Sequence, residues 1–315
     1  MKTMLERRID PAVALVVLVW GVVALGAPFV PMRFDHLSYL PPIAVGLGVA
    51  AISVFYARFR PDPKLAAATR ATALVLLFSC GLAISNYYGF AFHRPLVDER
   101  LAAIDEALGL DWWAYVTAVK TTPFLAPALT LAYESSLPQI VVAILALALT
   151  GRLDRLERFV LAFMIAAIAT VAMWSVFPNF GAYAIHFARP DVPNPPFPLA
   201  LGPDNARALL ALHGGDYPAL IRFGEMIGLV GCPSFHAVMA VLTAWALRDV
   251  PLIGPVALVV NALVLAAVPA DGGHHFVDAG VGTLLALAAV AAVRRVGARR
   301  PSAVPLAIAE PAPAE

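Results

Sequence analysis

The chain has 315 residues, of which 61% are hydrophobic and only 14% are charged. Soluble globular domains carry roughly 25% charged residues, so this composition excludes a soluble enzyme or an acidic or basic binding module and indicates an integral membrane protein. The formal net charge of +1 says little about partners, and nucleic-acid binding has no support because the basic residues cluster at the predicted cytoplasmic ends of the apolar stretches. The two cysteines, Cys80 and Cys232, lack the spacing of a disulfide framework or a zinc site.

Eight apolar stretches are long enough to approach the roughly 20 residues that cross a hydrocarbon core. We predict an all-α polytopic membrane protein, a bundle of about eight transmembrane helices, with spans near residues 11–30, 40–57, 70–90, 136–150, 158–177, 233–247, 251–269 and 276–293. The first stretch follows Lys2, Arg7 and Arg8, and its length predicts a retained anchor rather than a cleaved signal.

The distribution of basic residues predicts the orientation of the bundle. With eight spans and a cytoplasmic N-terminus, most of the 22 Lys and Arg residues fall in inner segments, and the outer ones are Arg33, Arg94, Arg100, Lys120, Arg189, Arg207 and Arg222. This bias agrees with the positive-inside rule and places both termini in the cytoplasm. The Ala- and Arg-rich composition favours a bacterial inner membrane.

Two long segments lie on the predicted outer side. Residues 91–135 include an amphipathic piece with Trp112 and Trp113, which are suited to the membrane interface, and residues 178–232 are too rich in Pro and Gly for one regular element. We divide the chain into a two-span segment (1–68), a catalytic-type membrane domain (69–296) and a disordered cytoplasmic tail (297–315).

Polar residues gather where the sixth and eighth predicted spans meet the outer face. "PSFH" ends at His236, and "DGGHHFVD" holds His274 with Asp278 four residues later, on the same helix face if the helix has already begun. Ser234 and Gly273 offer a helix N-terminus and a close backbone approach, which suit a phosphate. His275 points elsewhere and has a lesser role. Two histidines and an aspartate are also zinc ligands, so a metal site is an alternative.

These two motifs resemble the second and third signatures of the type 2 phosphatidic acid phosphatase superfamily. The Phe of "PSFH", the long outer loop before it and "RPLVDERLAAIDEALGLDWW" look most like the inositolphosphotransferase (inositol phosphorylceramide synthase-like) branch. The resemblance implies that His274 is the nucleophile forming a phosphohistidine, that Asp278 polarises it and that His236 protonates the leaving group. It implies a membrane lipid as substrate, an extracytoplasmic active site, and no metal or other cofactor.

The resemblance leaves the phosphate-binding cations open. Ala267 and Val268 replace the Ser-Arg pair of the third motif, and the Lys of the first motif is replaced by Tyr87 or Ala182. The candidates for phosphate binding are therefore Ser234, Gly273, Arg222, Arg189 and His213, with Arg94 and Arg100 behind them. Hydrolysis of a lipid phosphate is one alternative to head-group transfer. A catalytically degenerate lipid-binding or transport protein is another.

Overall fold

The computed structural model describes residues 10–188, 197 and 203–295. Within these ranges the chain forms α-helices, three short 3-10 helices and no named strand. The α-helices are α1 (Pro11–Gly26), α2 (His36–Arg58), α3 (Pro63–Tyr87), α4 (Asp98–Ala107), α5 (Trp112–Thr121), α6 (Leu125–Glu134), α7 (Ser136–Leu149), α8 (Leu153–Val176), α9 (Ala182–Ala188), α10 (Pro203–His213), α11 (Phe235–Leu247), α12 (Ile253–Asp271) and α13 (Phe276–Arg295). The 3-10 helices are η1 (Ala27–Phe29), η2 (Tyr88–Phe92) and η3 (Phe223–Glu225).

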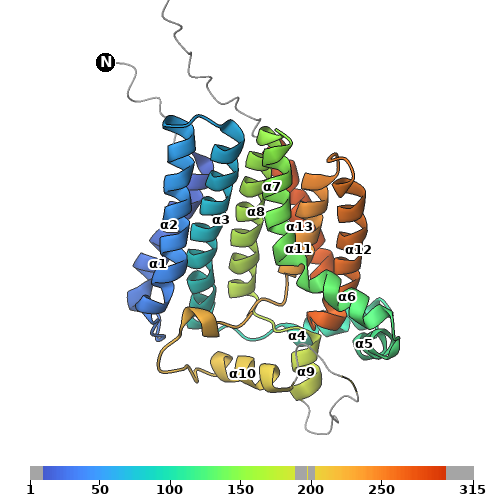
Figure 1. Cartoon of the computed structure of the whole chain (residues 1–315). Helices are drawn as coiled ribbons and strands as arrows, with labels where there is room; N and C mark the ends of the chain where they lie inside the picture. Colours follow the sequence, from blue (N-terminus) through green and yellow to red (C-terminus); the bar gives the residue numbers. More distant parts are fainter. Residues whose placement is uncertain (1–9, 189–196, 198–202, 296–315) are drawn as a thin grey trace, which may run out of the picture.

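The long helices stand side by side in one bundle, and the short helices gather at one end of it. In Figure 1 the start of α1 and the turn between α2 and α3 lie at the upper end, whereas α4, α9 and α10 lie across the lower end. A hydrogen bond from Lys64 Nζ to the backbone oxygen of Leu149 (2.9 Å) ties the start of α3 to the end of α7 at that upper end. The two ends of the bundle are therefore built differently, and among the described residues only the lower one is covered by short helices.

The predicted all-α polytopic fold is confirmed, and the number of spans is lower than eight by length and composition. Among the described residues six helices qualify: α1 with η1, α2, α3 with η2, α8, α12 and α13. The pair α6 and α7, bent by 54° at its break, makes a seventh if it counts as one span. The remaining predicted span is α11, which is apolar but has only 13 residues.

Local sequence explains where several helices begin. Asp10 and Asp62 accept backbone N–H groups of the first turns of α1 and α3, and a proline follows each of them at the first helical position. Asp111 caps α5 in the same way through the N–H of Ala114. Such N-caps satisfy donors that the helix itself leaves unpaired, and proline loses nothing there.

The core of the bundle is built around α8, which buries Phe159, Met164 and Trp174 completely. In contrast, α1 and α2 expose large apolar side chains such as Val17 (66%) and Val45 (58%). Contiguous exposed apolar surface of this kind is stable only against lipid or another apolar surface. This distribution supports membrane embedding of the bundle.

The N-terminal helices pack onto the rest through α3. Gly46 on α2 lies against Leu77 of α3, since a Cβ there would lie 2.7 Å from a Leu77 methyl group. The predicted domain boundary after residue 68 falls inside α3 (Pro63–Tyr87). The functional division of the chain remains a prediction, and the tail 297–315 lies outside the described residues.

Candidate active site

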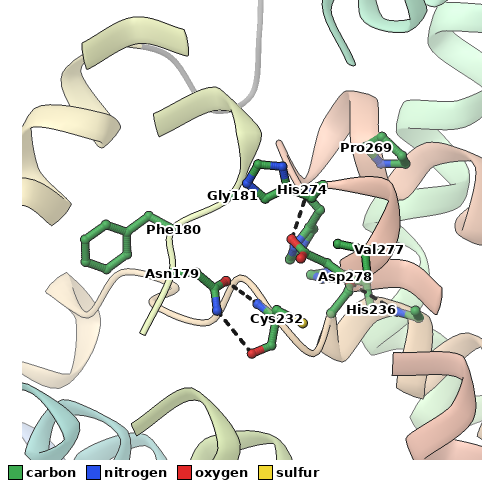
Figure 2. Close-up of polar contacts among 12 residues, drawn as sticks. Asn179, Phe180, Gly181, Cys232, His236, Pro269, His274, Val277 and Asp278 are labelled. Atoms are coloured by element: carbon green, nitrogen blue, oxygen red, sulfur yellow. Dashed lines mark hydrogen bonds and ion pairs between the residues drawn. The ribbon is translucent and has the colours of Figure 1, made fainter. Parts of the chain in front are cut away.

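His274 stands in the short turn between α12 and α13, at the end of the bundle that carries α4 and α9. Its Nδ1 lies 3.3 Å from Oδ2 of Asp278, and both residues are buried, with exposed fractions of 5% and 0%. Figure 2 shows this contact. The same carboxylate oxygen accepts the backbone N–H of His275 (2.9 Å). Because α13 begins only at Phe276, the two residues meet by a cap of the helix start rather than along one helix face.

Gly273 gives the turn its shape. It has φ of +64°, a left-handed conformation that favours glycine, and an added Cβ would lie 2.5 Å from Cδ1 of Tyr183. Its carbonyl oxygen accepts the N–H of Tyr183 (3.2 Å), and Gly181 packs directly against that oxygen. The segment before α9 therefore holds the backbone on which His274 sits.

His236 lies in the first turn of α11 and is held by Tyr133 of α6. The Tyr133 hydroxyl is 2.9 Å from His236 Nδ1, and the two rings are stacked with their centroids 3.9 Å apart. This contact occupies Nδ1, so Nε2 is the nitrogen of His236 that remains for proton transfer. Tyr133 was not anticipated from the sequence, because nothing near it in the chain marks it as a partner of a histidine 103 residues away.

The two histidines belong to one cluster. A Cβ added to Gly272 would lie 2.6 Å from both His274 Cδ2 and the Tyr133 hydroxyl, so these two groups lie close to the same side of this glycine. The backbone N–H of Ser234 also donates to the carbonyl oxygen of Asp278 (3.0 Å), tying the start of α11 to the start of α13. Figure 2 shows His236, His274 and Asp278 in this region.

The other predicted phosphate binders are distributed differently. Ser234 is fully buried, and its hydroxyl caps α11 by accepting the N–H of Ala237 (3.4 Å). The backbone N–H and the hydroxyl of Ser234 are therefore both hydrogen-bonded to other groups of the protein. Arg222 pairs with Asp35 and Glu225 beside the start of α2, away from the contacts of His274. Arg189 lies outside the described residues.

His213, at the end of α10, lies at the edge of the site. Its ring packs edge-on against Phe180 with centroids 5.9 Å apart. Burial lowers the pKa of His213 from its ordinary value, and the nearby Asp98 carboxylate opposes this shift. His213 therefore approaches the loop that supports Gly273, which Arg222 does not.

Lys120, which the sequence predicted only to lie in an outer segment, is a buried cation next to the turn that carries His274. Lys120 Nζ is 2.7 Å from Oδ1 of Asp271, and their side chains are 7% and 1% exposed. Thr130 donates its hydroxyl to the same oxygen (2.6 Å). Asp271 is the last residue of α12, directly before Gly272. An acid and a lysine that lie 151 residues apart give no local signal of this pairing.

Two further aspartates, both on α4, fasten the backbone around His274. Asp98 accepts the N–H groups of Phe180 (2.9 Å) and Gly181 (2.8 Å). Asp105 accepts those of Phe276 (2.7 Å) and Val277 (2.9 Å), the first turn of α13. We call Asp98 and Asp105 the α4 clasp. Their seven-residue spacing, two helical turns, places both carboxylates on the same face of α4.

His275 fills the space between the two clasp carboxylates. Its Nε2 is 3.6 Å from Asp98 and its Nδ1 is 3.8 Å from Asp105, and the residue is 1% exposed. The sequence predicted that the His275 side chain points away from His274 and Asp278, and this arrangement agrees with that prediction. Its position between two carboxylates gives it a larger structural part than expected.

Asn179 and Cys232 join the segment before α9 to the segment before α11. The Asn179 side chain accepts the N–H of Cys232 and donates to its carbonyl oxygen (3.4 Å), as drawn in Figure 2. Burial, with a smaller contribution from Asp278, raises the pKa of the Cys232 thiol. Cys80 and Cys232 are both free. Within the described ranges, no group of three or more His, Cys, Asp or Glu side chains is arranged to hold a metal ion.

Comparison with known proteins gives one clear result. No curated protein and no solved structure matches the chain. The family model described as PAP2 superfamily matches residues 99–292, which is more than half of the chain and includes every residue of the His236 and His274 cluster. Members of this superfamily are generally phosphatases, so the match supports an enzyme with phosphatase-type activity on lipid phosphates. The chain belongs to the PAP2 superfamily.

Proposed function

We propose that the protein is a membrane-embedded phosphatase or phosphotransferase that acts on lipid-linked phosphate esters through a phosphohistidine on His274. The observation that supports this most directly is the buried contact of 3.3 Å between His274 Nδ1 and Asp278. A carboxylate on Nδ1 orients an imidazole and stabilises the positive charge that its Nε2 gains on attacking an electrophile.

In the first half of the proposed reaction, Nε2 of His274 attacks phosphorus and the bond to the leaving alkoxide breaks. His236 donates the Nε2 proton to that alkoxide, while its Nδ1–H remains on the Tyr133 oxygen 2.9 Å away. In the second half, neutral His236 removes a proton from water or from an acceptor alcohol, whose oxygen attacks phosphorus and releases His274. The proton and the phosphoryl group thus balance over the two steps.

The phosphoryl oxygens need positive charge, and the motif residues that supply it elsewhere in the family are absent here. Lys120 is the buried cation next to the turn of His274, through its ion pair with Asp271. Gly273 shapes the turn that carries His274, and His213 lies at the edge of the site. We propose Lys120 as the main charge stabiliser and keep Arg189 as a predicted contributor.

The preferred reaction is transfer of a phosphorylated head group, inositol phosphate in the branch that the motifs resemble, to a lipid alcohol. Simple hydrolysis uses the same intermediate and differs only in the acceptor. The site lies at the end of the bundle opposite the start of α1 (Figure 1), so a cytoplasmic N-terminus would put it on the extracytoplasmic side of the membrane. A bacterial inner membrane remains our expectation.

The test uses the purified full chain in detergent with phosphatidic acid or phosphatidylinositol as substrate, with and without EDTA. We expect released phosphate or a transferred head group in EDTA, and loss of turnover by about a hundredfold or more in His274→Ala. Radiolabelled phosphate should be trapped on the wild type and be absent from His274→Ala. His36→Ala, an exposed histidine on α2, is the matched control and should keep full turnover.

Other outcomes select the alternatives. Activity that EDTA abolishes would favour a zinc site built from the same histidines. Folded protein without turnover on any lipid would favour the catalytically degenerate lipid-binding or transport protein.

A further inference from the structure

A polar cavity lies at the end of the bundle away from His274, where α8 begins and α11 and α13 end. Its volume is about 520 Å³, within the range of small-molecule sites. The residues that matter for its chemistry are five arginines and a tryptophan: Arg152, Arg155, Arg158, Arg248, Arg294 and Trp245. None of them takes part in the His274 cluster.

The cavity carries an excess of positive charge. Against the five arginines stand two acids, Asp154 in the lining and Asp249 beside it. Asp249 pairs with Arg155 (2.5 Å) and with Arg248 (3.4 Å), and these pairs still leave three positive charges in excess. Partial burial and, to a smaller extent, the charge of the neighbouring Arg155 lower the pKa of Arg248, as expected where cations are crowded.

Several donors in this region have no acceptor. Arg155 Nη1, Arg158 Nε and Trp245 Nε1 are buried atoms without a hydrogen-bond partner among the described residues. Buried polar groups are normally paired, and leaving one unpaired costs about 1–3 kcal/mol. Unpaired N–H donors on three residues that line one cavity therefore favour an acceptor ligand in this region.

Two other features favour an anion as that acceptor. The N-cap residue of α8, Arg152, makes no side-chain cap hydrogen bond, so the positive end of the helix dipole faces the cavity without a protein acceptor. Arg248 and Arg294 lie over the ring of Trp245 at 5.7 and 5.9 Å, which holds their guanidinium groups in place.

We propose that this cavity binds a phosphate-bearing anion, either the head group of an anionic phospholipid or a free phosphate compound. Guanidinium groups recognise phosphate oxygens by paired hydrogen bonds, and basic pockets between transmembrane helices bind anionic head groups. The positive-inside rule explains exposed arginines at this end, such as Arg58 and Arg60. It does not explain unpaired buried donors on arginines that line one cavity with a tryptophan. The site is independent of the catalytic proposal.

The test titrates the purified full chain with inorganic phosphate, or incorporates it into nanodiscs of phosphatidylcholine with or without phosphatidylglycerol, and follows tryptophan fluorescence. Signal that disappears in Trp245→Phe reports this cavity, whereas signal that remains reports other sites, including His274. We expect Arg158→Gln to weaken the Trp245-dependent binding about tenfold, the effect of losing one charge-assisted hydrogen bond. Arg60→Gln, an exposed arginine at the same end, should change it less than about twofold.

Each outcome decides the proposal. Response to phosphate, to phosphatidylglycerol or to both supports the cavity and identifies the source of the anion. Equal weakening by Arg158→Gln and Arg60→Gln would mean diffuse surface charge and would overturn it, as would the absence of any Trp245-dependent response. If Arg158→Gln fails to fold by thermal unfolding, Arg294→Gln, at an exposed position of the same cavity, takes its place. Turnover at His274 should stay unchanged in all these variants.

Discussion

Lys120 and Asp271 form a buried ion pair of 2.7 Å directly before the glycines that lead to His274. The pair joins α5 to the end of α12, and Thr130 of α6 adds a hydrogen bond to the same carboxylate oxygen. These two contacts thereby tie α5 and α6 to the turn that carries His274.

Removing one partner of this pair should be costly. We expect Lys120→Gln to lower stability by about 3–5 kcal/mol, because an uncompensated buried carboxylate remains. The double variant Lys120→Met with Asp271→Leu should recover much of that stability in thermal unfolding while turnover stays low. Recovery of turnover in the folded double variant would show that Lys120 has no part in binding the phosphoryl group.

Tyr133→Phe should lower kcat about tenfold with little change in KM, because it frees His236 Nδ1 and loosens the orientation of the proton donor. The stacked ring is kept, so the melting temperature should change little. Steady-state kinetics on a lipid phosphate measures the effect. A kcat equal to that of the wild type would rule out an orienting role for the hydroxyl.

Gly273→Ala should strongly reduce both stability and turnover. Its φ of +64° is unfavourable for alanine, and the new methyl group would meet Tyr183 at 2.5 Å. The matched control is Gly280→Ala on α13, where nothing lies within 4 Å of an added Cβ. Thermal unfolding and turnover of the two variants should diverge, and equal behaviour would contradict the role of the turn.

Asp105→Ala should destabilise the start of α13, because the N–H groups of Phe276 and Val277 lose their acceptor. Each unpaired buried donor costs about 1–3 kcal/mol. Hydrogen exchange at these two amides is the direct measurement, with Glu106→Ala, an exposed neighbour, as the control. Unchanged protection in Asp105→Ala would mean that the α4 clasp is not needed there.

We expect His213 to contribute to the loss of stability of the folded protein at acidic pH. Its pKa is lowered by burial, so the unfolded chain binds the proton more readily than the folded one. Stability should therefore fall as pH drops below about 6.5, the ordinary pKa of histidine. His213→Gln should flatten that part of the stability profile measured by thermal unfolding between pH 5 and pH 8. A profile as steep as that of the wild type would assign the effect to other groups.

The parts of the fold that could be predicted are those with a local signal. Hydropathy alone places the helices α1, α2, α3, α8, α12 and α13, because each is a long apolar run. The bend of 54° between α6 and α7 carries no such signal: the run 125–149 is apolar on both sides of it, and α11 is cut to 13 residues by its polar start.

The candidate site divides in the same way. His236, His274 and Asp278 could be found because their motifs are short and contiguous. Lys120 and Tyr133 could not, because their partners are 151 and 103 residues away. The partners of the α4 clasp lie 82–172 residues from it, and only the packed bundle brings these groups together. Arg222 was a candidate from its charge alone, yet its ion pairs are with Asp35 and Glu225 and not with the His274 cluster.

The α4 clasp also bears on how the protein matures in the cell. The carboxylate of Asp105 can form its two hydrogen bonds only after Phe276 and Val277 have been synthesised, 171 and 172 residues later. Because Phe276 and Val277 are the first two residues of α13, the α4 clasp can close at this end only after most of the bundle has been synthesised.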